Sequence, residues 1–306
     1  MMKTGKPSNE MNDKSVLVTG CSSGLGLATA LELAARGFRV FATMRELTRR
    51  GELEAQAAQR GLTIEVLPLD VTRPETIDAA IATIIERSGT LYGVVNNAGV
   101  ALRGFFEDLT EEEIRHVFET NVFGTMAVTR AALPHMRAAR EGRIVIVTSV
   151  GGRQGVLALT GYCASKFALE GFGEALMQEV KPFGIAVSLV APGITPTPIW
   201  DRSIAKNALN PDSPYHALFL EYRRMVQKVM RGATVTPEAV GQSIGDILMA
   251  ERPQLRYLIG WRPKLLFALR RYLPGESFDR AYTWLVLRRV QGRARSTKTP
   301  QAELTP

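Results

Sequence analysis

Residue types that hold metals or build disulfide frameworks are scarce in this sequence. Its 306 residues include two cysteines and three histidines. Cys21 and Cys163 cannot form the disulfide framework of a small secreted protein, so we expect a reducing, cytoplasmic compartment. The histidines, His116, His135 and His216, are widely separated and lack the spacing of metal ligands. The sequence therefore predicts no metal site.

Long apolar segments are also lacking. No apolar run approaches the ~20 residues that a membrane-spanning helix requires. The first 14 residues, MMKTGKPSNEMNDK, are polar and do not contain the apolar centre of a secretory signal. We therefore expect no helix that spans a membrane, and a disordered N-terminal tail at residues 1–13.

Positive charge is lacking in most of the chain, although the formal net charge is +8. Residues 252–295 contain 11 Lys and Arg against two acids, and residues 296–306 contain one of each, so the first 251 residues carry a net charge of about −1. A uniformly basic nucleic-acid-binding protein is therefore disfavoured. The basic charge belongs to a C-terminal extension at residues 261–295, which a disordered tail at 296–306 follows.

Between Ser15 and Gly260, short apolar runs alternate with longer helical patterns. Most of the runs are continuous, as in strands covered on both faces. The predicted strands are Ser15–Thr19, Arg39–Ala42, Thr63–Pro68, Gly93–Val95, Arg143–Val147, Ala186–Val190 and Tyr257–Ile259. The predicted helices lie near residues 24–36, 74–88, 111–119, 122–139, 161–182 and 237–250. This alternation, with no internal linker, predicts a doubly wound parallel α/β sheet in a single domain over residues 14–260.

Residues 194–232 interrupt the alternation. They contain four prolines, followed by a helical stripe of Leu218, Tyr222, Met225 and Val229. A long insertion near the carboxyl end of a strand is a common place for a substrate lid. A surface helix packed on the sheet explains the same pattern equally well, and both interpretations stay open.

The first predicted strand leads into a glycine-rich turn, Thr19-Gly20-Cys21-Ser22-Ser23-Gly24-Leu25-Gly26, and then into a helix. Glycines let backbone N–H groups approach a pyrophosphate, and the helix N-terminus favours its negative charge. Three glycines can also form an ordinary tight turn. The position of the turn, directly after the first strand, favours nucleotide binding.

Tyr162 and Lys166 lie four residues apart in a predicted helix, so their side chains share a face. A phenol has a reference pKa of ~10. We expect a lysine ammonium ~4 Å away to lower that pKa enough for proton transfer near neutral pH. The pair alone is weak support for an enzyme, since tyrosine and lysine are common in helices.

Further polar residues follow other predicted strands. Ser149 follows Arg143–Val147 and lies 13 residues before Tyr162, where its hydroxyl can bond a substrate oxygen. Asn121 stands where a helix is predicted to begin, and a helix cap is the plain structural explanation for it. The remaining segments of this kind are Asn96-Asn97-Ala98-Gly99 and Pro192-Gly193, with Thr197 shortly beyond.

In their order and spacing, these motifs resemble the short-chain dehydrogenase/reductase family over about residues 14–260. The resemblance implies a Rossmann-like sheet of seven strands, a nicotinamide dinucleotide, and a homodimer or homotetramer. It implies that Tyr162 is the general acid/base, that Lys166 holds the nicotinamide ribose and lowers the tyrosine pKa, and that Ser149 bonds the substrate oxygen. Asn121 completes the implied tetrad. The implied cofactor contacts are Gly20, Ser22, Ser23, Gly24, Leu25, Gly26, Asp70, Val71, Asn97, Ala98, Gly99, Tyr162, Lys166, Pro192, Gly193 and Thr197.

Two stretches resemble the hydroxysteroid and retinol dehydrogenase branch of that family. They are GCSSGLGLATALELAARGFRVFATMREL and GYCASKFALEGFGEALMQEVKPFGIAVSLVAPG. General carbonyl reductases share such stretches, so the resemblance leaves the substrate open. A regulator that binds the nucleotide without catalysis is the main rival of another class, and the filled tetrad disfavours it.

The end of the second predicted strand indicates the form of the cofactor. An acidic residue there would hold the adenosine ribose diol of NAD. Residues 40–44 contain no Asp or Glu, and Arg45 follows them, although the adjacent Glu46 could point inward instead. A guanidinium suits a 2′-phosphate, and Ser23 matches a position that assists the phosphate in related enzymes. We therefore expect NADP(H) in preference to NAD(H).

Apolar residues flank the predicted site, and they suggest a sizeable apolar substrate with one carbonyl or secondary alcohol. A general reductase of small ketones and aldehydes is the alternative, because many of these residues could simply belong to the core. The candidate pocket residues are Val100, Leu102, Phe105, Phe106, Val156, Leu157, Leu159, Ile199, Trp200, Leu218 and Phe219.

The C-terminal extension mixes large apolar residues with arginine, and Pro274-Gly275 divides it into two predicted helices. Helices with one apolar and one basic face can lie in the interface of an anionic membrane. The apolar face could equally pack on the enzyme or at a subunit contact. The sequence leaves peripheral membrane contact and internal packing as alternatives.

Overall fold

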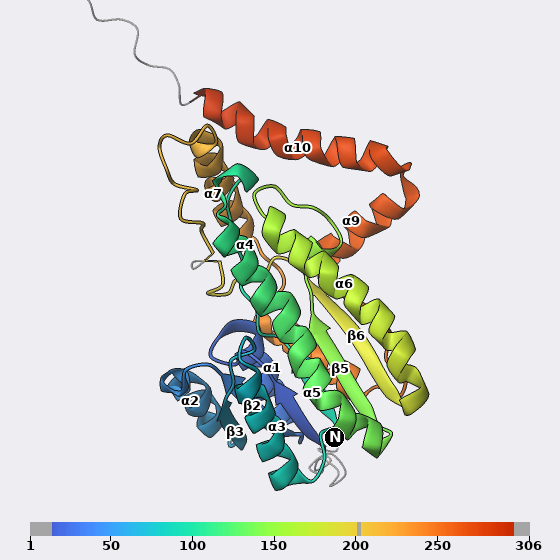
Figure 1. The fold of residues 1–306 in the computed structure, drawn as a ribbon. Coiled ribbons are helices and arrows are strands. Elements are labelled where there is room, and N and C mark those ends of the chain that lie inside the picture. The colour runs from blue at the N-terminus through green and yellow to red at the C-terminus, as the bar shows by residue number, and fades with distance from the viewer. Residues whose placement is uncertain (1–13, 201–202, 297–306) are drawn as a thin grey trace, which may run out of the picture.

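A computed structural model of the protein describes residues 14–200 and 203–296. Seven parallel strands form one sheet in the order β3-β2-β1-β4-β5-β6-β7 (Figure 1). Their bounds are β1 Ser15–Val18, β2 Arg39–Met44, β3 Ile64–Pro68, β4 Gly93–Asn96, β5 Gly142–Val147, β6 Ile185–Pro192 and β7 Arg256–Ile259. The predicted doubly wound parallel sheet of seven strands is confirmed.

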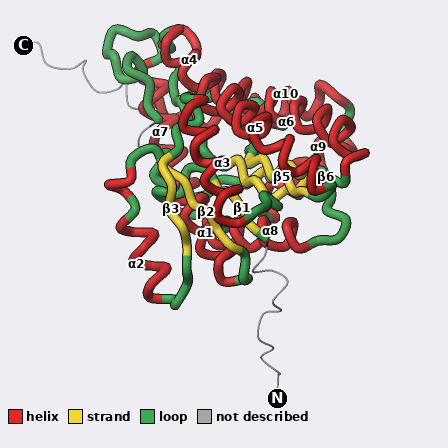
Figure 2. Tube along the Cα trace, turned by 60° about the horizontal axis from the view of Figure 1, so that its bottom comes forward, coloured by secondary structure: helices red, strands yellow, loops and turns green. Residues whose placement is uncertain are grey.

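Helices cover both faces of the sheet (Figure 2). One apolar cluster joins the sheet to α1 (Gly24–Ala35), α2 (Gly51–Gln59) and α8 (Pro237–Met249). A second joins the opposite face to α3 (Pro74–Ser88), α5 (Gly124–Ala139) and α6 (Thr160–Val180). The central strands are buried on both sides, which explains why they are almost purely apolar in sequence.

The sequence prediction differs from the structure at two places in these helices. It missed α2, because this short helix is polar and buries only Leu53 and Ala57. It also placed Asn121 at a helix start. Instead α4 (Glu111–Phe118) continues through a π-helical turn at Glu119–Phe123 directly into α5, and Asn121 lies inside that turn. Such turns are rare and often mark functional sites.

The insertion at 194–232 contains α7 (His216–Arg231), which confirms the predicted helical stripe. Phe219 and Tyr222 on α7 are fully buried in a third apolar cluster, together with Leu102 from the loop after β4. Arg103 lies in the same loop after β4 and is hydrogen-bonded to the beginning of the insertion. Its guanidinium donates to Ser203 Oγ at 2.7 Å and to the Trp200 carbonyl oxygen. The insertion is thus packed on the loop that follows β4.

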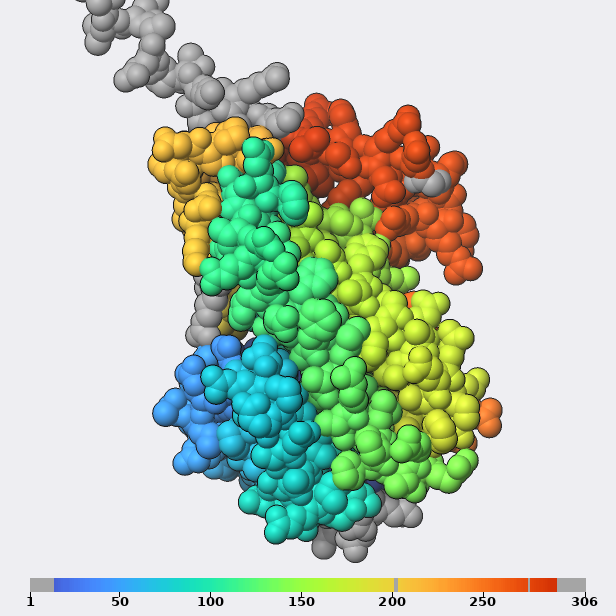
Figure 3. All heavy atoms as spheres, in the orientation of Figure 1, coloured from blue at the N-terminus to red at the C-terminus, as the bar shows by residue number. Residues whose placement is uncertain are grey.

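The C-terminal extension forms two helices, α9 (Trp261–Tyr272) and α10 (Gly275–Ser296), as the sequence predicted. They lie at one end of the molecule, and α10 packs against α7 (Figure 3). Within residues 14–200 and 203–296, no helix is both long and apolar enough to cross a membrane. The predicted tail at 1–13 lies outside the described residues, as does the tail at 296–306 except for Ser296, which ends α10.

Candidate active site

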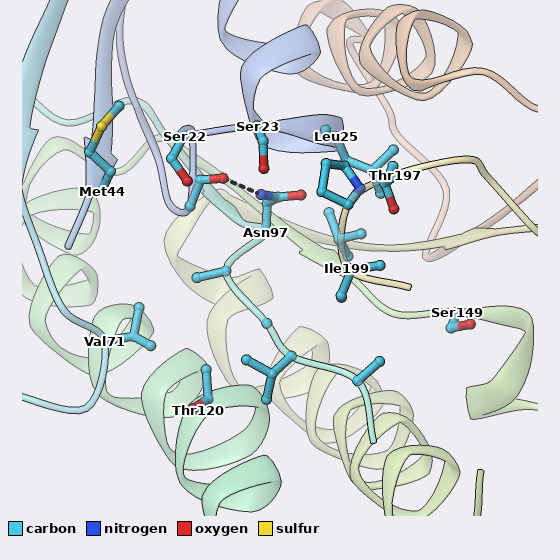
Figure 4. Close-up of a pocket in the computed structure, with 18 of the residues that line it drawn as sticks. Ser22, Ser23, Leu25, Met44, Val71, Asn97, Thr120, Ser149, Thr197 and Ile199 are labelled. Atoms are coloured by element: carbon cyan, nitrogen blue, oxygen red, sulfur yellow. Dashed lines mark hydrogen bonds between the residues drawn. The ribbon is translucent and has the colours of Figure 1, made fainter. Parts of the chain in front are cut away.

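A cavity of about 300 Å³ opens at the carboxyl ends of the strands, where the strand order reverses between β1 and β4. Ligands of open α/β sheets bind at this crevice. The cavity is lined by all of the predicted site residues except Gly26 and Asn121. Residues from seven separate stretches of sequence therefore meet at one place (Figure 4).

The glycine-rich turn forms one wall. Gly20 and Gly24 have φ values of +74° and +60°, which favour glycine. Ser23 precedes the first turn of α1, and its side chain makes no capping hydrogen bond. Figure 4 shows the Ser22 and Ser23 hydroxyls beside the cavity. The hydroxyls and the helix N-terminus can therefore meet an anion.

Gly26 does not line the cavity but supports its wall. A Cβ at Gly26 would lie 2.3 Å from the Gly20 carbonyl oxygen and 2.5 Å from Asn97 Nδ2. Asn97 Nδ2 donates to the carbonyl oxygens of Thr19 at 2.8 Å and of Gly20 at 3.3 Å, the latter visible in Figure 4. Gly26 thus allows the asparagine to hold the turn in place.

Two arginines and two carboxylates line the part of the cavity just beyond β2. Arg45 and Arg49 both line it, while the last residue of β2 is the buried, uncharged Met44. Asp70 lines the cavity as well, and burial alone would raise the pKa of its carboxyl group. Hydrogen bonds from Thr72, together with the positive charges of Arg45 and Arg73, lower that pKa below its usual value. Asp70 is therefore ionised near neutral pH. Glu46 lines the cavity as well.

Ser149 and Tyr162 also line the cavity and lie together. Ser149 Oγ accepts a hydrogen bond from the Gly151 N–H at 3.1 Å, which fixes the hydroxyl. Burial raises the pKa of Tyr162 to about 12, and a hydrogen bond with the Ser149 side chain opposes this rise. The sequence analysis expected Lys166 to lower this pKa. In the structure Ser149 is the neighbour that lowers it.

Lys166 is buried beside the tyrosine, with Nζ 5.8 Å from the centre of its ring. Nζ donates to the Val147 carbonyl oxygen at 2.9 Å, at the end of β5. Burial lowers the pKa of Lys166 to about 8, because the low-dielectric surroundings disfavour the ammonium. The predicted shared helix face is present, but the ammonium is directed toward the strand.

Asn121 is fully buried and does not line the cavity. Its Oδ1 accepts from the Val100 N–H at 2.8 Å, and its Nδ2 donates to the Val100 carbonyl at 2.9 Å and to Ser165 Oγ at 3.0 Å. A Cβ at Gly99 would lie 3.1 Å from Asn121 Oδ1 and 3.7 Å from Lys166 Nζ. The π-helical turn therefore aims Asn121 at the loop after β4 and brings it close to Lys166.

A partly buried ionic cluster links the sheet to the corner formed by Ser149, Tyr162 and Lys166, which we call the reactive corner. Thr148 Oγ1 donates to Glu170 Oε1 at 2.8 Å, and Arg256 Nε on β7 donates to Glu170 Oε2 at 3.1 Å. Glu170 lies four residues after Lys166 on α6, and Thr148 precedes Ser149. The cluster therefore fixes the helix that carries Tyr162 relative to the strand that leads to Ser149.

The sequence analysis missed several residues of the cavity. Arg49 follows Arg45 by four residues, and the 3₁₀ turn at Leu47–Arg49 brings it to the cavity. Of the predicted apolar pocket residues, Val100, Ile199 and Trp200 line the cavity, whereas Phe219 is buried in the core and Phe106 is 64% exposed. The other missed lining residues are Met44, Leu69, Ala101, Thr120, Val147, Thr148, Thr195 and Pro198.

Gly26→Ala should weaken dinucleotide binding at least about tenfold, or prevent folding, because the new methyl group overlaps the Gly20 carbonyl and Asn97. Gly171→Ala on α6 is the matched control, since a Cβ there meets no atom within 4 Å. The control should bind normally and be up to ~1 kcal/mol more stable. Calorimetric titration and thermal unfolding measure both effects. Normal binding by a folded Gly26→Ala variant would contradict this role of Gly26.

Comparisons with known proteins agree with this geometry. Residues 14–208 match the family described as short chain dehydrogenase. The chain is 37% identical to human retinol dehydrogenase 8, over 79% of this chain and 80% of that protein. It is 36% identical to human 17-beta-hydroxysteroid dehydrogenase type 1, over 85% of this chain and 78% of that protein.

A solved short-chain dehydrogenase from Streptomyces avermitilis is similar in structure as well. It superposes with a TM-score of 0.73 at 33% identity, covering 94% of this chain and 99% of that one. The chain therefore belongs to the short-chain dehydrogenase family, in the retinol and hydroxysteroid dehydrogenase branch, and is an oxidoreductase that interconverts alcohols and carbonyls with a nicotinamide dinucleotide.

Proposed function

We propose that this enzyme uses NADP(H) to interconvert a secondary alcohol and a carbonyl on a mainly apolar, lipid-like substrate, with Tyr162 as general acid/base. The observation that carries the proposal is the arrangement of one cavity. It is lined by Arg45 and Arg49 just beyond β2, by the hydroxyls of Ser149 and Tyr162, and by the apolar side chains of Val100, Ile199 and Trp200. Residues 14–260 form the catalytic domain in this proposal, with 194–232 as the lid.

The cavity residues fit the phosphorylated dinucleotide. The uncapped N-terminus of α1 and the Ser23 hydroxyl suit a pyrophosphate. Arg45 and Arg49 suit a 2′-phosphate, because each guanidinium can form charge-assisted bonds with phosphate oxygens. The end of β2 is Met44, so it provides no carboxylate for the ribose diol that NAD presents there.

The chemistry divides between the cofactor and three side chains. When bound, the nicotinamide ring supplies or accepts the hydride. Ser149, held by the Gly151 N–H, donates a hydrogen bond to the substrate oxygen. Tyr162 gives its proton to that oxygen in carbonyl reduction and removes it in alcohol oxidation. Lys166 has two further N–H donors besides the one bonded to the Val147 carbonyl, so it can bind ribose hydroxyls, and it provides positive charge near the phenol.

Apolar residues that line the cavity support the proposed substrate class. Val100, Ala101, Pro198, Ile199 and Trp200 offer little beyond apolar surface to a bound molecule. Such walls favour a substrate whose body is hydrocarbon and whose single polar group faces the two hydroxyls. The similarity to proteins named retinol and hydroxysteroid dehydrogenases supports the same class. A general reductase of small ketones is the second candidate.

Tyr162→Phe should reduce kcat by about 10²–10⁴-fold while leaving cofactor affinity nearly unchanged, because only the titrating hydroxyl is lost. In the wild-type enzyme alcohol oxidation should rise with increasing pH, since it needs the deprotonated phenol and the pKa of Tyr162 is raised. Carbonyl reduction needs the protonated phenol and should lack this rise. Steady-state rates across the pH range test both points. A variant that keeps more than about a tenth of the wild-type kcat would rule out this role.

Arg45→Ala and Arg49→Ala should each weaken NADPH binding by roughly 10–150-fold and change NADH binding little, because each removes a charged partner of the phosphate. Arg50→Ala is the matched control. Arg50 is exposed, pairs with Glu54 and does not line the cavity. The test is to measure the dissociation constants of NADPH and NADH for the wild type and for the three variants. Equal losses of affinity for NADPH and NADH, or a wild-type preference for NADH, would show that the two arginines do not bind the 2′-phosphate.

Substrate preference should rise with apolar size. Each buried methylene contributes ~0.8 kcal/mol, which corresponds to about a fourfold gain in kcat/KM for each added carbon. A series of 2-ketones of increasing length, extended with steroid and retinoid substrates, measures this gain through NADPH absorbance. A kcat/KM for acetone that matches that of the long ketones would favour the small-ketone reductase instead.

A further inference from the structure

The outer face of α9 is an exposed apolar stripe. Trp261, Leu265, Leu269 and Tyr272 recur at intervals of three to four residues, so they share one side of the helix. All four are exposed, with fractions from 48% for Leu269 to 82% for Tyr272. On α10, Trp284 and Leu285 are exposed at 56% and 48%. Large apolar residues gathered in this way usually mark a contact surface.

The inner faces of the same helices already hold the extension in place. Phe278 and Val290 of α10 are buried, and α10 packs along α7. On α9, Arg270 Nη1 donates to the Arg153 carbonyl at 2.5 Å, and the Arg153 guanidinium lies 4.9 Å from the centre of the Phe267 ring. The exposed stripe is therefore not required to anchor the helices on the enzyme.

Basic side chains surround the exposed apolar residues. Residues 261–290 contain seven Lys and Arg but only two acids, Glu276 and Asp279, which pair with Arg280 and Arg270. Four further basic residues are exposed and form no salt bridge within the described part of the chain. They are Lys264, Arg271, Arg288 and Arg289. The guanidinium of Arg288 stacks 4.9 Å from the Trp284 ring.

We propose that this outer face of α9 and α10 docks on the surface of an anionic lipid bilayer. Tryptophan and tyrosine are amphipathic and suited to the headgroup region. Helices with apolar and basic residues on their exposed side lie in that interface, and each Lys or Arg near it adds about 1 kcal/mol with anionic lipid. A second copy of the chain fits less well, because a symmetric contact would place the unpaired arginines against one another.

The inner side of α9, opposite the docked face, contacts the segment that follows Ser149. The loop at 150–153 that Arg270 and Phe267 contact begins directly after Ser149. α10 also packs against α7 of the insertion, and Figure 1 labels both helices. If the proposed apolar substrate is correct, a substrate dissolved in the bilayer reaches the enzyme beside its lid. The docking itself does not depend on that substrate.

The test is co-sedimentation of the full-length protein with phosphatidylcholine vesicles, with and without about 30% phosphatidylglycerol, at low and high salt. We expect sedimentation with the anionic vesicles at low salt. Arg288→Glu/Arg289→Glu should lower the partition coefficient at least about tenfold. The matched control, Arg60→Glu/Arg252→Glu, has the same charge change at exposed sites outside α9 and α10 and should change it less than about twofold.

Tryptophan fluorescence identifies the surface that binds. The chain has three tryptophans, and two of them, Trp261 and Trp284, lie on the proposed face. Brominated lipid should quench the wild-type protein, whereas Trp261→Phe/Trp284→Phe, which retains Trp200, should show little quenching. Protein that stays in the supernatant with anionic vesicles at low salt would overturn the proposal, as would equal binding by the two charge variants. Turnover of a soluble ketone, measured separately, tells a failed docking from a failed catalytic assignment.

Discussion

The hydrogen bonds between Thr19 and Asn97 join the two strand ends on either side of the crevice. Thr19 Oγ1 accepts from the Asn97 and Ala98 N–H groups at 3.0 and 2.9 Å, and Asn97 Nδ2 donates back to the Thr19 carbonyl. Because β1 and β4 are the neighbouring strands at which the strand order reverses, the bonds fix the glycine-rich turn against the loop after β4. The uncapped N-terminus of α1 directly follows the first of these segments, and the Val100 backbone that Asn121 contacts follows the second.

Features that repeat locally along the chain could be predicted from the sequence. All seven strands were found within a few residues. The central strands are apolar runs that both helix layers cover, whereas the edge strands β3 and β7 are only partly buried. Tyr162 and Lys166 were placed on one helix face by their spacing alone. The glycine-rich turn was recognised because few residues other than glycine tolerate its backbone, as the positive φ values of Gly20 and Gly24 show.

Features that depend on distant parts of the chain could not be predicted in this way. The Lys166 ammonium is bonded to Val147, a residue of another element, and no spacing reveals that contact. Asn121 lies in a π-helical turn, and its amide is hydrogen-bonded to both backbone groups of Val100, a residue 21 positions earlier in the chain. Arg49 lines the cavity only because of the 3₁₀ turn after β2. In each case tertiary packing, which the sequence pattern does not record, decides where the side chain points.

The pKa values of the reactive corner have one common cause. Burial raises the pKa of Tyr162 to about 12 and lowers that of Lys166 to about 8, because the surroundings disfavour charge on either group. A phenolate therefore needs nearby positive charge, and the closest source is an ammonium now held by the Val147 carbonyl. With a pKa of about 12, the phenol of Tyr162 is protonated near neutral pH, and the Lys166 ammonium, 5.8 Å from the centre of its ring, is the positive charge that would offset the burial of a phenolate.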